Sequence, residues 1–345
     1  MRSLGIDFEH ALIQAPMAGA QNIELAIAVT AAGGLGSLPA AMLTSEQLNH
    51  SLLRFREEVS GPINVNFFCH TPPATDERFS ASWLQALQPY FDEFKIEKSS
   101  ISGGAERRPF SHEACDVLER FSPEVVSFHF GLPSAELIDR VHAMGSLIAA
   151  TATTPEEAVW LEANGADWII AQGLQAGGHR GHFLSADLSV QLGLNELLPA
   201  ILKLVDLPVI AAGGIGDAEQ VKKYLDVGAS AVQIGTSFLL CDEATTSAVH
   251  RQALTPQSGD HTAITNVFSG RPARGIVNRA IRELGVMSSV APPFPQAATA
   301  ITAVRQQAEA KGDGDFSPLW SGQNTRGCDK IPAAKMLQRL MSVTN

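Results

Sequence analysis

The stretch PVIAAGGI, residues 208–215, is an apolar run that stops at two glycines before a final isoleucine. A similar stretch, AVQIGT, occupies residues 231–236, and the segment between them begins at Asp217 and closes at Gly228. Aspartate is favoured at the residue that caps the start of a helix, and glycine just after its end. The two stretches therefore predict parallel strands joined by a helix.

Similar apolar runs recur along the whole chain, and most are followed by a segment with helix start and stop signals. Thr154, Pro155 and Glu157, for example, offer a capping hydroxyl, a proline in the first turn and a capping-box carboxylate. Parallel strands read as apolar throughout when helices cover one face and a barrel interior the other. Eight such runs predict a (β/α)8 TIM barrel. The predicted strands are residues 12–16, 34–38, 63–68, 125–130, 146–152, 167–172, 208–212 and 231–235.

The chain is longer than a bare barrel needs. Its 345 residues exceed the roughly 250 of a typical barrel, so we expect an added piece. We assign residues 1–240 to the barrel, residues 241–315 to a mainly helical insertion or lid, and residues 316–345 to a segment whose last helix, near residues 331–341, returns to the barrel. A surface excursion is expected around residues 98–109, which are polar and contain glycine.

The charge and the apolar runs exclude several classes of partner. The net charge is −11, whereas affinity for nucleic acid and anionic membranes comes from clustered Lys and Arg. The longest apolar stretches, such as residues 25–32, fall short of the roughly 20 residues of a membrane span. Asp7 and Glu9 stand where a signal peptide would be basic and then apolar. We expect no nucleic-acid or membrane partner and a cytoplasmic location.

The four cysteines, Cys69, Cys115, Cys241 and Cys328, are widely separated and form no CxxC pair. This spacing indicates neither a zinc site nor a disulfide framework. We therefore expect no metal and free thiols in a reducing compartment.

Glycine turns after the seventh and eighth strands predict a phosphate site. Gly213 and Gly214 follow one strand, Gly235 and Thr236 follow the next, and each turn leads into a helix. Backbone N–H groups can approach an anion closely at glycine, and a helix N-terminus adds a favourable dipole. A phosphomonoester ligand is the inference at this point, with its identity open.

Three histidines stand near strand ends. His129 lies at the tip of the fourth strand, where alternation can aim its ring into the barrel mouth. A lone histidine is more often structural, but its place at a carboxyl end favours function. His179 and His182 lie in a glycine-rich loop with Arg180. For His179 a ligand contact and a solvated basic turn weigh equally, and for His182 we favour the solvated turn.

A series of motifs stands in order through nearly the whole chain: QAPMAG (14–19), NVNFF (64–68), SFHFGLP (127–133), QG and AGGHRG (172–181), AAGGI (211–215), QIGT (233–236) and FSGRPARG (268–275). Taken together, these motifs resemble the nitronate monooxygenases, formerly called 2-nitropropane dioxygenases. QG with AGGHRG, and AAGGI, are shared with FMN-dependent enoyl-acyl-carrier-protein reductases, whereas HFGLP at residues 129–133 is typical of the monooxygenases.

The resemblance implies non-covalently bound FMN and oxidation of alkyl nitronates, such as propionate 3-nitronate, with O2 to a carbonyl compound and nitrite. It implies that His129 is the base for neutral nitroalkanes and positions nitronates, and we assign substrate contact to His179. Amides at strand tips would bind the polar edge of the flavin, while the glycine turns hold its phosphate. The predicted cofactor-binding residues are Ala15, Pro16, Met17, Asn66, Gln172, Gly177, Gly178, Gly213, Gly214, Gln233, Ile234, Gly235 and Thr236.

Two alternatives stay open at this point. An FMN-dependent NAD(P)H reductase of enoyl thioesters or quinones is disfavoured by HFGLP, and a non-redox phosphate-binding barrel by Asn66 and Gln172 at strand ends. The sequence also departs from the family pattern. Tyrosines frequent in the C-terminal part are missing, with Phe294 and Phe316 in that region, and Gln175 stands where glutamate is frequent. These departures bear on which substrate is preferred. The sequence also leaves open whether the protein forms a homo-oligomer and whether NAD(P)H reacts with it.

Overall fold

The fold of the chain is a closed parallel barrel. The computed structural model describes residues 2–74, 77–101 and 107–343, and within them eight parallel strands follow the order β1-β9-β8-β6-β5-β4-β3-β2. The ring closes between β1 and β2, where Gln14 N donates to Leu35 O at 2.9 Å. This arrangement confirms the predicted TIM barrel. The strands are β1 Leu12–Gln14, β2 Gly36–Pro39, β3 Ile63–Phe68, β4 Val125–His129, β5 Leu147–Ala152, β6 Trp168–Gln172, β8 Val209–Ala212 and β9 Ala231–Ile234.

Helices surround this barrel and begin where the sequence places their caps. Asp217 Oδ1 accepts a hydrogen bond from Gln220 N at 2.8 Å, and Gly228 ends the same helix with a φ of 121°. The expected last helix is α12 Ala333–Met341, which packs against α1 and α8. The other surrounding helices are α1 Ile23–Ala31, α2 Ser45–Glu58, α4 His112–Leu118, α5 Ala135–Ala143, α6 Pro155–Ala163, α7 Leu194–Leu202 and α8 Ala218–Val227.

The amino-terminal end of the barrel is filled by apolar side chains. Ile13, Trp168 and Ile170 form part of one buried cluster, against which Leu4 and other residues of the N-terminal segment pack. Trp168 Nε1 also donates to Leu4 O at 3.0 Å. Since this end is closed, access to the interior is from the carboxyl ends of the strands.

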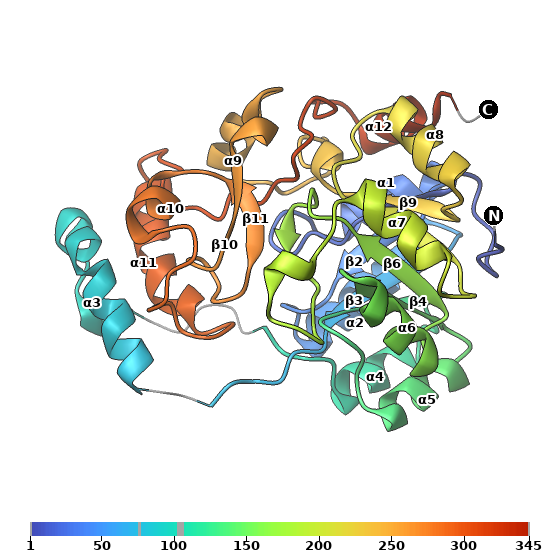
Figure 1. Cartoon of the computed structure of the whole chain (residues 1–345), viewed down its shortest axis with the longest axis horizontal. Coiled ribbons are helices and arrows are strands. Elements are labelled where there is room, and N and C mark those ends of the chain that lie inside the picture. Colours follow the sequence, from blue (N-terminus) through green and yellow to red (C-terminus); the bar gives the residue numbers. More distant parts are fainter. Residues whose placement is uncertain (1, 75–76, 102–106, 344–345) are drawn as a thin grey trace.

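A subdomain covers one side of that open end, as Figure 1 shows. It contains the antiparallel strand order β10-β11-β7 in addition to helices. Two of its elements come from barrel connections: α3 Glu77–Phe94 and β7 Gly178–His179. The remaining elements of the subdomain are α9 Ala248–Ala253, β10 Thr262–Thr265, β11 Ala273–Ile276, α10 Arg279–Leu284 and α11 Ala297–Glu309. Along the chain as a whole, short 3₁₀ turns occur at Lys98–Ser100, Leu188–Val190, Thr236–Phe238 and Ser258–His261.

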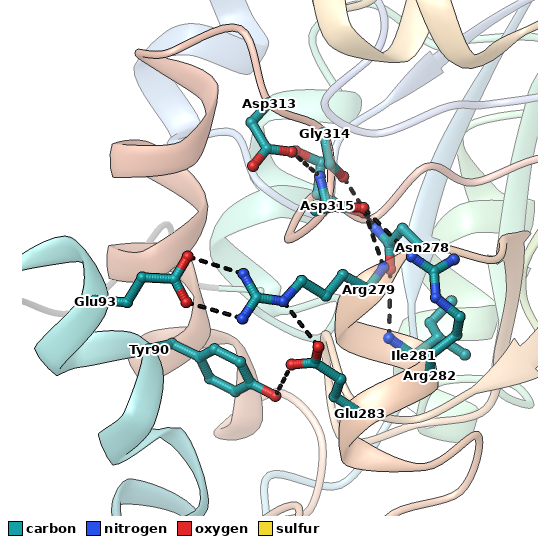
Figure 2. A network of polar contacts seen from close by, with 11 residues as sticks. Tyr90, Glu93, Asn278, Arg279, Ile281, Arg282, Glu283, Asp313, Gly314 and Asp315 are labelled. Atoms are coloured by element: carbon teal, nitrogen blue, oxygen red, sulfur yellow. Dashed lines mark hydrogen bonds and ion pairs between the residues drawn. The ribbon is translucent and has the colours of Figure 1, made fainter.

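Helix α3 packs against α11 rather than against the barrel, at the outer side of the subdomain (Figure 1). Trp83 on α3 is 1% exposed, and its Nε1 donates to Ala297 O at 3.0 Å. Figure 2 shows a second set of contacts, in which both Nη atoms of Arg279 on α10 lie 2.8 Å from the Glu93 carboxylate. In the same network Tyr90 donates to Glu283 Oε2 at 3.0 Å. An apolar core and an ion-pair network therefore both hold α3.

The piece expected as a surface excursion returns to the barrel at its end. Its residues 102–106 lie outside the described residues. Beyond them, Phe110 N donates to Phe68 O at 2.8 Å, and Pro109 bridges Phe68 at the end of β3. Arg107 is thereby held over the carboxyl ends of the strands.

No helix in the described part of the chain is long and apolar enough to cross a membrane. The four cysteines are unpaired. Among the described residues, no cluster of three or more His, Cys, Asp or Glu side chains could hold a metal ion.

Candidate active site

A cavity of about 290 Å³ lies at the carboxyl ends of the strands. All 15 residues that the sequence nominates as catalytic, cofactor-binding or substrate-binding line this one cavity. They come from the ends of β1, β3, β4, β6, β8 and β9 and from the loop through β7. The structure thus brings together residues as far apart in the sequence as Ala15 and Thr236, while their individual roles stay predictions.

The glycine turn after β8 has the backbone geometry that a phosphate cradle needs. Gly213 and Gly214 have φ values of 117° and 72°, in the region that favours glycine. A Cβ on Gly214 would lie 2.8 Å from Gln175 Cβ. Gln175 cannot move away freely, because its Oε1 accepts from Leu194 N at 3.0 Å. Other side chains are therefore excluded here, and the backbone faces the cavity directly.

Three amide side chains line the cavity as the resemblance requires. Gln233 Oε1 is buried without a hydrogen-bond partner in the described structure. Asn66 Nδ2 donates to Ser127 Oγ at 3.0 Å, which fixes the direction of the amide. Gln172 joins β6 to the β7 loop, donating to His179 O and accepting from Gly181 N, both at 2.9 Å. These groups fit a ligand with a polar, hydrogen-bonding edge such as a flavin.

Both ring nitrogens of His129 are engaged. Its Nε2 lies 3.1 Å from the carbonyl oxygen of His179, which can only accept, so Nε2 carries the proton. Its Nδ1 lies 3.0 Å from Thr151 Oγ1 and accepts from that hydroxyl. The backbone of Gly181 also packs closely against the ring: a Cβ added at this glycine would lie only 2.8 Å from His129 Cε1. In this arrangement His129 presents no free lone pair to the cavity.

In contrast to His129, His179 has only one of its two ring nitrogens hydrogen-bonded within the described part of the chain. The hydroxyl of Ser269 is placed to donate to Arg271 O at 3.2 Å, and with its proton there its oxygen accepts from His179 Nε2, 2.9 Å away. Nε2 therefore carries the proton, and Nδ1 of the neutral ring holds the lone pair. Among the described residues, that Nδ1 has no hydrogen-bond partner.

Burial, together with the charges around these two rings, keeps them neutral. Burial lowers the pKa of His129 to about 3, and the charges of Arg271 and Arg180 act in the same direction. Burial and the charge of Arg107 hold the pKa of His179 well below its ordinary value. Both rings are thus uncharged near neutral pH.

The loop that carries His179 and His182 is not a solvated basic turn, so the interpretation favoured for His182 was wrong. Arg180 is 0% exposed, because its guanidinium donates to Gln172 O, Gly173 O and Gln191 Oε1, each at 2.8 Å. Burial lowers the pKa of Arg180 to about 9. His182 is likewise buried, at 7% exposure. Internal hydrogen bonds therefore make this loop a rigid wall of the site.

Several cavity residues escaped the sequence reasoning. Thr151 could have been found, because it lies near the carboxyl end of β5 and alternation aims it inward. Another group belongs to the subdomain, to the segment after it or to the β3–β4 connection, where no strand pattern orients side chains. These include Arg107, Thr246, His250, Arg305, Glu309 and Trp320.

The two phenylalanines noted as departures have different surroundings. Phe294 packs in an aromatic cluster with Phe68 and Phe130 beside the cavity, with ring centroids 6.0 and 5.5 Å away. Phe316 lies in the subdomain core, 4.9 Å from the Tyr90 ring. Only the first of them is near the candidate site.

Comparison with known proteins agrees with this geometry. A family profile described as nitronate monooxygenase matches residues 3–342. The chain is 38% identical to a nitronate monooxygenase of Pseudomonas aeruginosa, covering 99% of this chain and 97% of the relative. It is 36% identical to one of Paraburkholderia phytofirmans, covering 98% and 92%.

Solved structures give the same result. The structure of a nitroalkane oxidase from Streptomyces ansochromogenes superimposes with a TM-score of 0.88 at 37% identity, covering 97% of this chain and 95% of the other. FabK from Thermotoga maritima shares the fold, with a TM-score of 0.72 at 24% identity over 97% and 92% of the chains. On the profile match and the full-length relatives, the chain belongs to the nitronate monooxygenase family.

Proposed function

We propose that this protein oxidises alkyl nitronates with O2 to a carbonyl compound and nitrite, using FMN. The observation that carries the proposal is the single cavity that collects the strand-end amides, the glycine turns and two neutral histidines. A non-redox phosphate site would have no use for Asn66 and Gln172 beside the histidines.

FMN is the flavin that suits this cavity. The family is flavin-dependent, and two glycine turns on neighbouring strands suit one terminal phosphate. Gly213, Gly214, Gly235 and Thr236 would hold that phosphate, and Asn66, Gln172 and Gln233 the polar edge of the ring. Ala15 to Met17, Gly177, Gly178 and Ile234 complete the wall. When bound, FMN takes electrons from the nitronate and passes them to O2.

The side chains of the protein would bind the substrate and, for a neutral nitroalkane, remove its α-proton. A nitronate has already lost its α-proton, whereas a neutral nitroalkane needs a base. His179 Nδ1 offers the free lone pair for that step, while Nε2 keeps its proton and donates it in a hydrogen bond to Ser269 Oγ. His129, the base that the family resemblance implies, instead donates from Nε2 to the His179 carbonyl oxygen in this arrangement. We therefore propose His179 as the base and His129 as its positioning residue. The subdomain of residues 241–315, with α3, would act as the roof of the site.

Anaerobic mixing tests the function directly. The purified protein should be yellow and release FMN on denaturation. Propionate 3-nitronate or an alkyl nitronate should reduce the flavin rapidly without O2, and NADH or NADPH should do so slowly. Rapid reduction by a nicotinamide with no response to any nitronate would assign the protein to the reductases. A protein that gains no flavin spectrum with added FMN would remove the cofactor proposal.

A further inference from the structure

A second cavity lies behind the aromatic cluster that borders the candidate active site. Its volume is about 450 Å³, and it lies between the loop after β3, residues 69–73, and residues 270–272. Phe68 lines the first cavity, whereas Phe130 and Phe294, which both pack on Phe68, line the second. None of the described residues lines both. This rear cavity is therefore a space separate from the candidate active site.

Arg271 supplies the rear cavity with an oriented cation. Its Nη2 donates to His182 O, and its Cζ lies 4.0 Å from the centre of the Phe130 ring. Burial lowers its pKa to about 10, so the guanidinium stays protonated at neutral pH. Its Nε is buried and has no hydrogen-bond partner in the described structure. A fixed guanidinium with an unused donor on its side-on edge is suited to bind a carboxylate.

The charge of Arg271 is not neutralised by a carboxylate among the described residues. Glu157 acts on its pKa from a distance. The oxygens of Glu157 are already bound, however, since they accept from Thr153, Phe183 and Leu184. A partly buried cation without a counter-charge is unfavourable. A bound anion would therefore be stabilised at Arg271.

Two histidines that line the rear cavity each keep an unused acceptor. His70 and His182 are both 7% exposed, and Nδ1 of each has no hydrogen-bond partner in the part of the chain that the structure describes. The other ring nitrogen bonds a backbone carbonyl, that of Arg107 for His70 and that of Arg180 for His182. A carbonyl only accepts, so that nitrogen carries the proton and Nδ1 holds a lone pair. Burial and the charge of Arg271 lower the pKa of both rings to about 4, which keeps them neutral. Either Nδ1 can accept a hydrogen bond from a ligand hydroxyl.

The size and the remaining walls of the rear cavity favour an organic ligand over a bare ion. Three aromatic rings line it, Phe130, Phe183 and Phe294, together with Pro272 and Pro293. An inorganic ion would fill only a small part of about 450 Å³ and would leave these apolar surfaces against water. A flat ring packs on such walls in offset or edge-on contact. The body of the ligand is therefore expected to be aromatic.

We propose that the rear cavity binds a hydroxylated aromatic carboxylate that is neither substrate nor cofactor. Its ring packs against the phenylalanines, its carboxylate binds the guanidinium of Arg271, and its hydroxyl donates to Nδ1 of His70 or His182. The inference does not depend on the proposed function. The charge of Arg271 also lowers the pKa of His129 and His179, so an anion bound to Arg271 alters the electrostatic field at the candidate active site.

Matched ligands test the two polar contacts by calorimetry on the holoprotein. The better binder of 3- and 4-hydroxybenzoate is compared with the hydroxybenzamide of the same pattern, which lacks the charge, and with benzoate, which lacks the hydroxyl. The hydroxybenzoate should bind about 10- to 100-fold more tightly than the amide, as expected for a charge-assisted hydrogen bond. It should bind about 2- to 10-fold more tightly than benzoate, as expected for a neutral one. Equal affinity for acid and amide, or for hydroxybenzoate and benzoate, would overturn the proposal.

Variants of lining residues locate the ligand in the rear cavity. Arg271→Gln should weaken binding of the hydroxybenzoate by about tenfold or more and remove its advantage over the amide, and Arg271→Lys should restore part of it. Thr71→Trp, at an exposed position of the lining, should weaken binding by filling the space while leaving Arg271 in place. Arg282→Gln is the matched control, because Arg282 is exposed and lines neither cavity. Unchanged affinity in both Arg271→Gln and Thr71→Trp would overturn the proposal, and the thermal midpoint identifies a misfolded variant.

Two further variants assign the hydroxyl. His70→Phe and His182→Phe each keep an aromatic ring and remove the acceptor. One of them should lower the affinity for the hydroxybenzoate to that for benzoate, and the other then serves as its control. An advantage over benzoate that survives in both variants would contradict the place given to the hydroxyl.

Kinetics separate the rear cavity from the candidate active site. A ligand in the rear cavity does not occupy the place of a nitronate, so the hydroxybenzoate should not compete with the nitronate and should change kcat through the charge that it offsets at Arg271. The measurement is kcat and KM for propyl-1-nitronate at several concentrations of the hydroxybenzoate. A purely competitive pattern would place the compound in the first cavity and overturn the proposal. Binding by calorimetry in a protein that oxidises no nitronate would instead uphold the rear cavity and refute the proposed function.

Discussion

The imidazole of His129 donates its Nε2 proton to the backbone carbonyl of His179, 3.1 Å away. The two histidines thus come from β4 and from the β7 loop and are coupled through main chain rather than ring to ring. One ring has both nitrogens bonded, and the other keeps a lone pair. This asymmetry divides their roles and makes the roles separable by mutation.

Replacing His179 should affect neutral nitroalkanes most. General-base catalysis supplies about 10²- to 10⁴-fold, so His179→Asn should lower nitroalkane turnover by that order and retain much more nitronate activity. His129→Asn should lower both activities together and by less, since it acts through the position of His179. The measurement is kcat and KM for a nitroalkane and its nitronate, corrected for bound FMN. The reverse pattern, with a selective loss in His129→Asn, would restore His129 as the base.

The phosphate cradle can be tested with two glycines of similar backbone. Gly214 and Gly312 have φ values of 72° and 76°, so alanine costs each about 1–2 kcal/mol of backbone strain. Only at Gly214 would the Cβ also meet another side chain, whereas nothing lies within 4 Å at Gly312. Gly214→Ala should therefore weaken FMN binding about tenfold or more, measured by flavin fluorescence, and Gly312→Ala should not. Equal FMN affinity in the two variants would place the phosphate elsewhere.

The sequence predicts the barrel well because its strands are buried on both faces. The predicted run at residues 63–68 coincides with β3. The predicted strand limits are wrong at ends where backbone hydrogen bonding, and not hydrophobicity, determines where a strand stops. β1 stops at Gln14 although the apolar run continues to Pro16, and proline has no N–H to extend a ladder. Strand ends, where the site is built, are nevertheless located to within a residue or two.

The subdomain and its part of the site could not be predicted in the same way. Trp83 of α3 donates a hydrogen bond to Ala297, which lies 214 residues further along the chain. The hydrophobic periodicity of a segment does not identify a partner so distant in the sequence. His179 and Gly178 pair as a strand with Ala273 and Arg274, a pairing that the glycine-rich sequence of the loop did not predict. Arg107 and Arg305 line the cavity from the β3–β4 connection and from α11. This part of the site therefore depends on tertiary packing that the sequence pattern does not show.

Glu157 should be a strong determinant of stability. It is 1% exposed, and its carboxylate accepts from Thr153 N at 2.7 Å, Thr153 Oγ1 at 2.8 Å, Phe183 N at 2.6 Å and Leu184 N at 3.2 Å. Glu157→Gln points an amide N–H at one pair of these donors and should cost about 3 kcal/mol, measured by urea denaturation. Glu156→Gln, an exposed neighbour on α6, should stay within about 0.5 kcal/mol. A loss below about 1 kcal/mol in Glu157→Gln would mean that the loop at residues 183–184 adapts.

The buried histidines should make the fold labile to acid. Burial lowers the pKa of His129 to about 3 and that of His250 to about 4, whereas an unfolded histidine titrates near 6.5. Between these values the unfolded chain binds a proton that the folded chain does not. The stability from each ring is therefore complete above about pH 6.5 and is lost as the pH falls toward 4, at about 1.4 kcal/mol per pH unit. His250→Gln should lower the slope of unfolding free energy against pH, between about pH 6 and 5, by that amount for one histidine. His112→Gln on α4, at an exposed position, is the control, and equal slopes in the two variants would show that His250 is protonated within the folded protein.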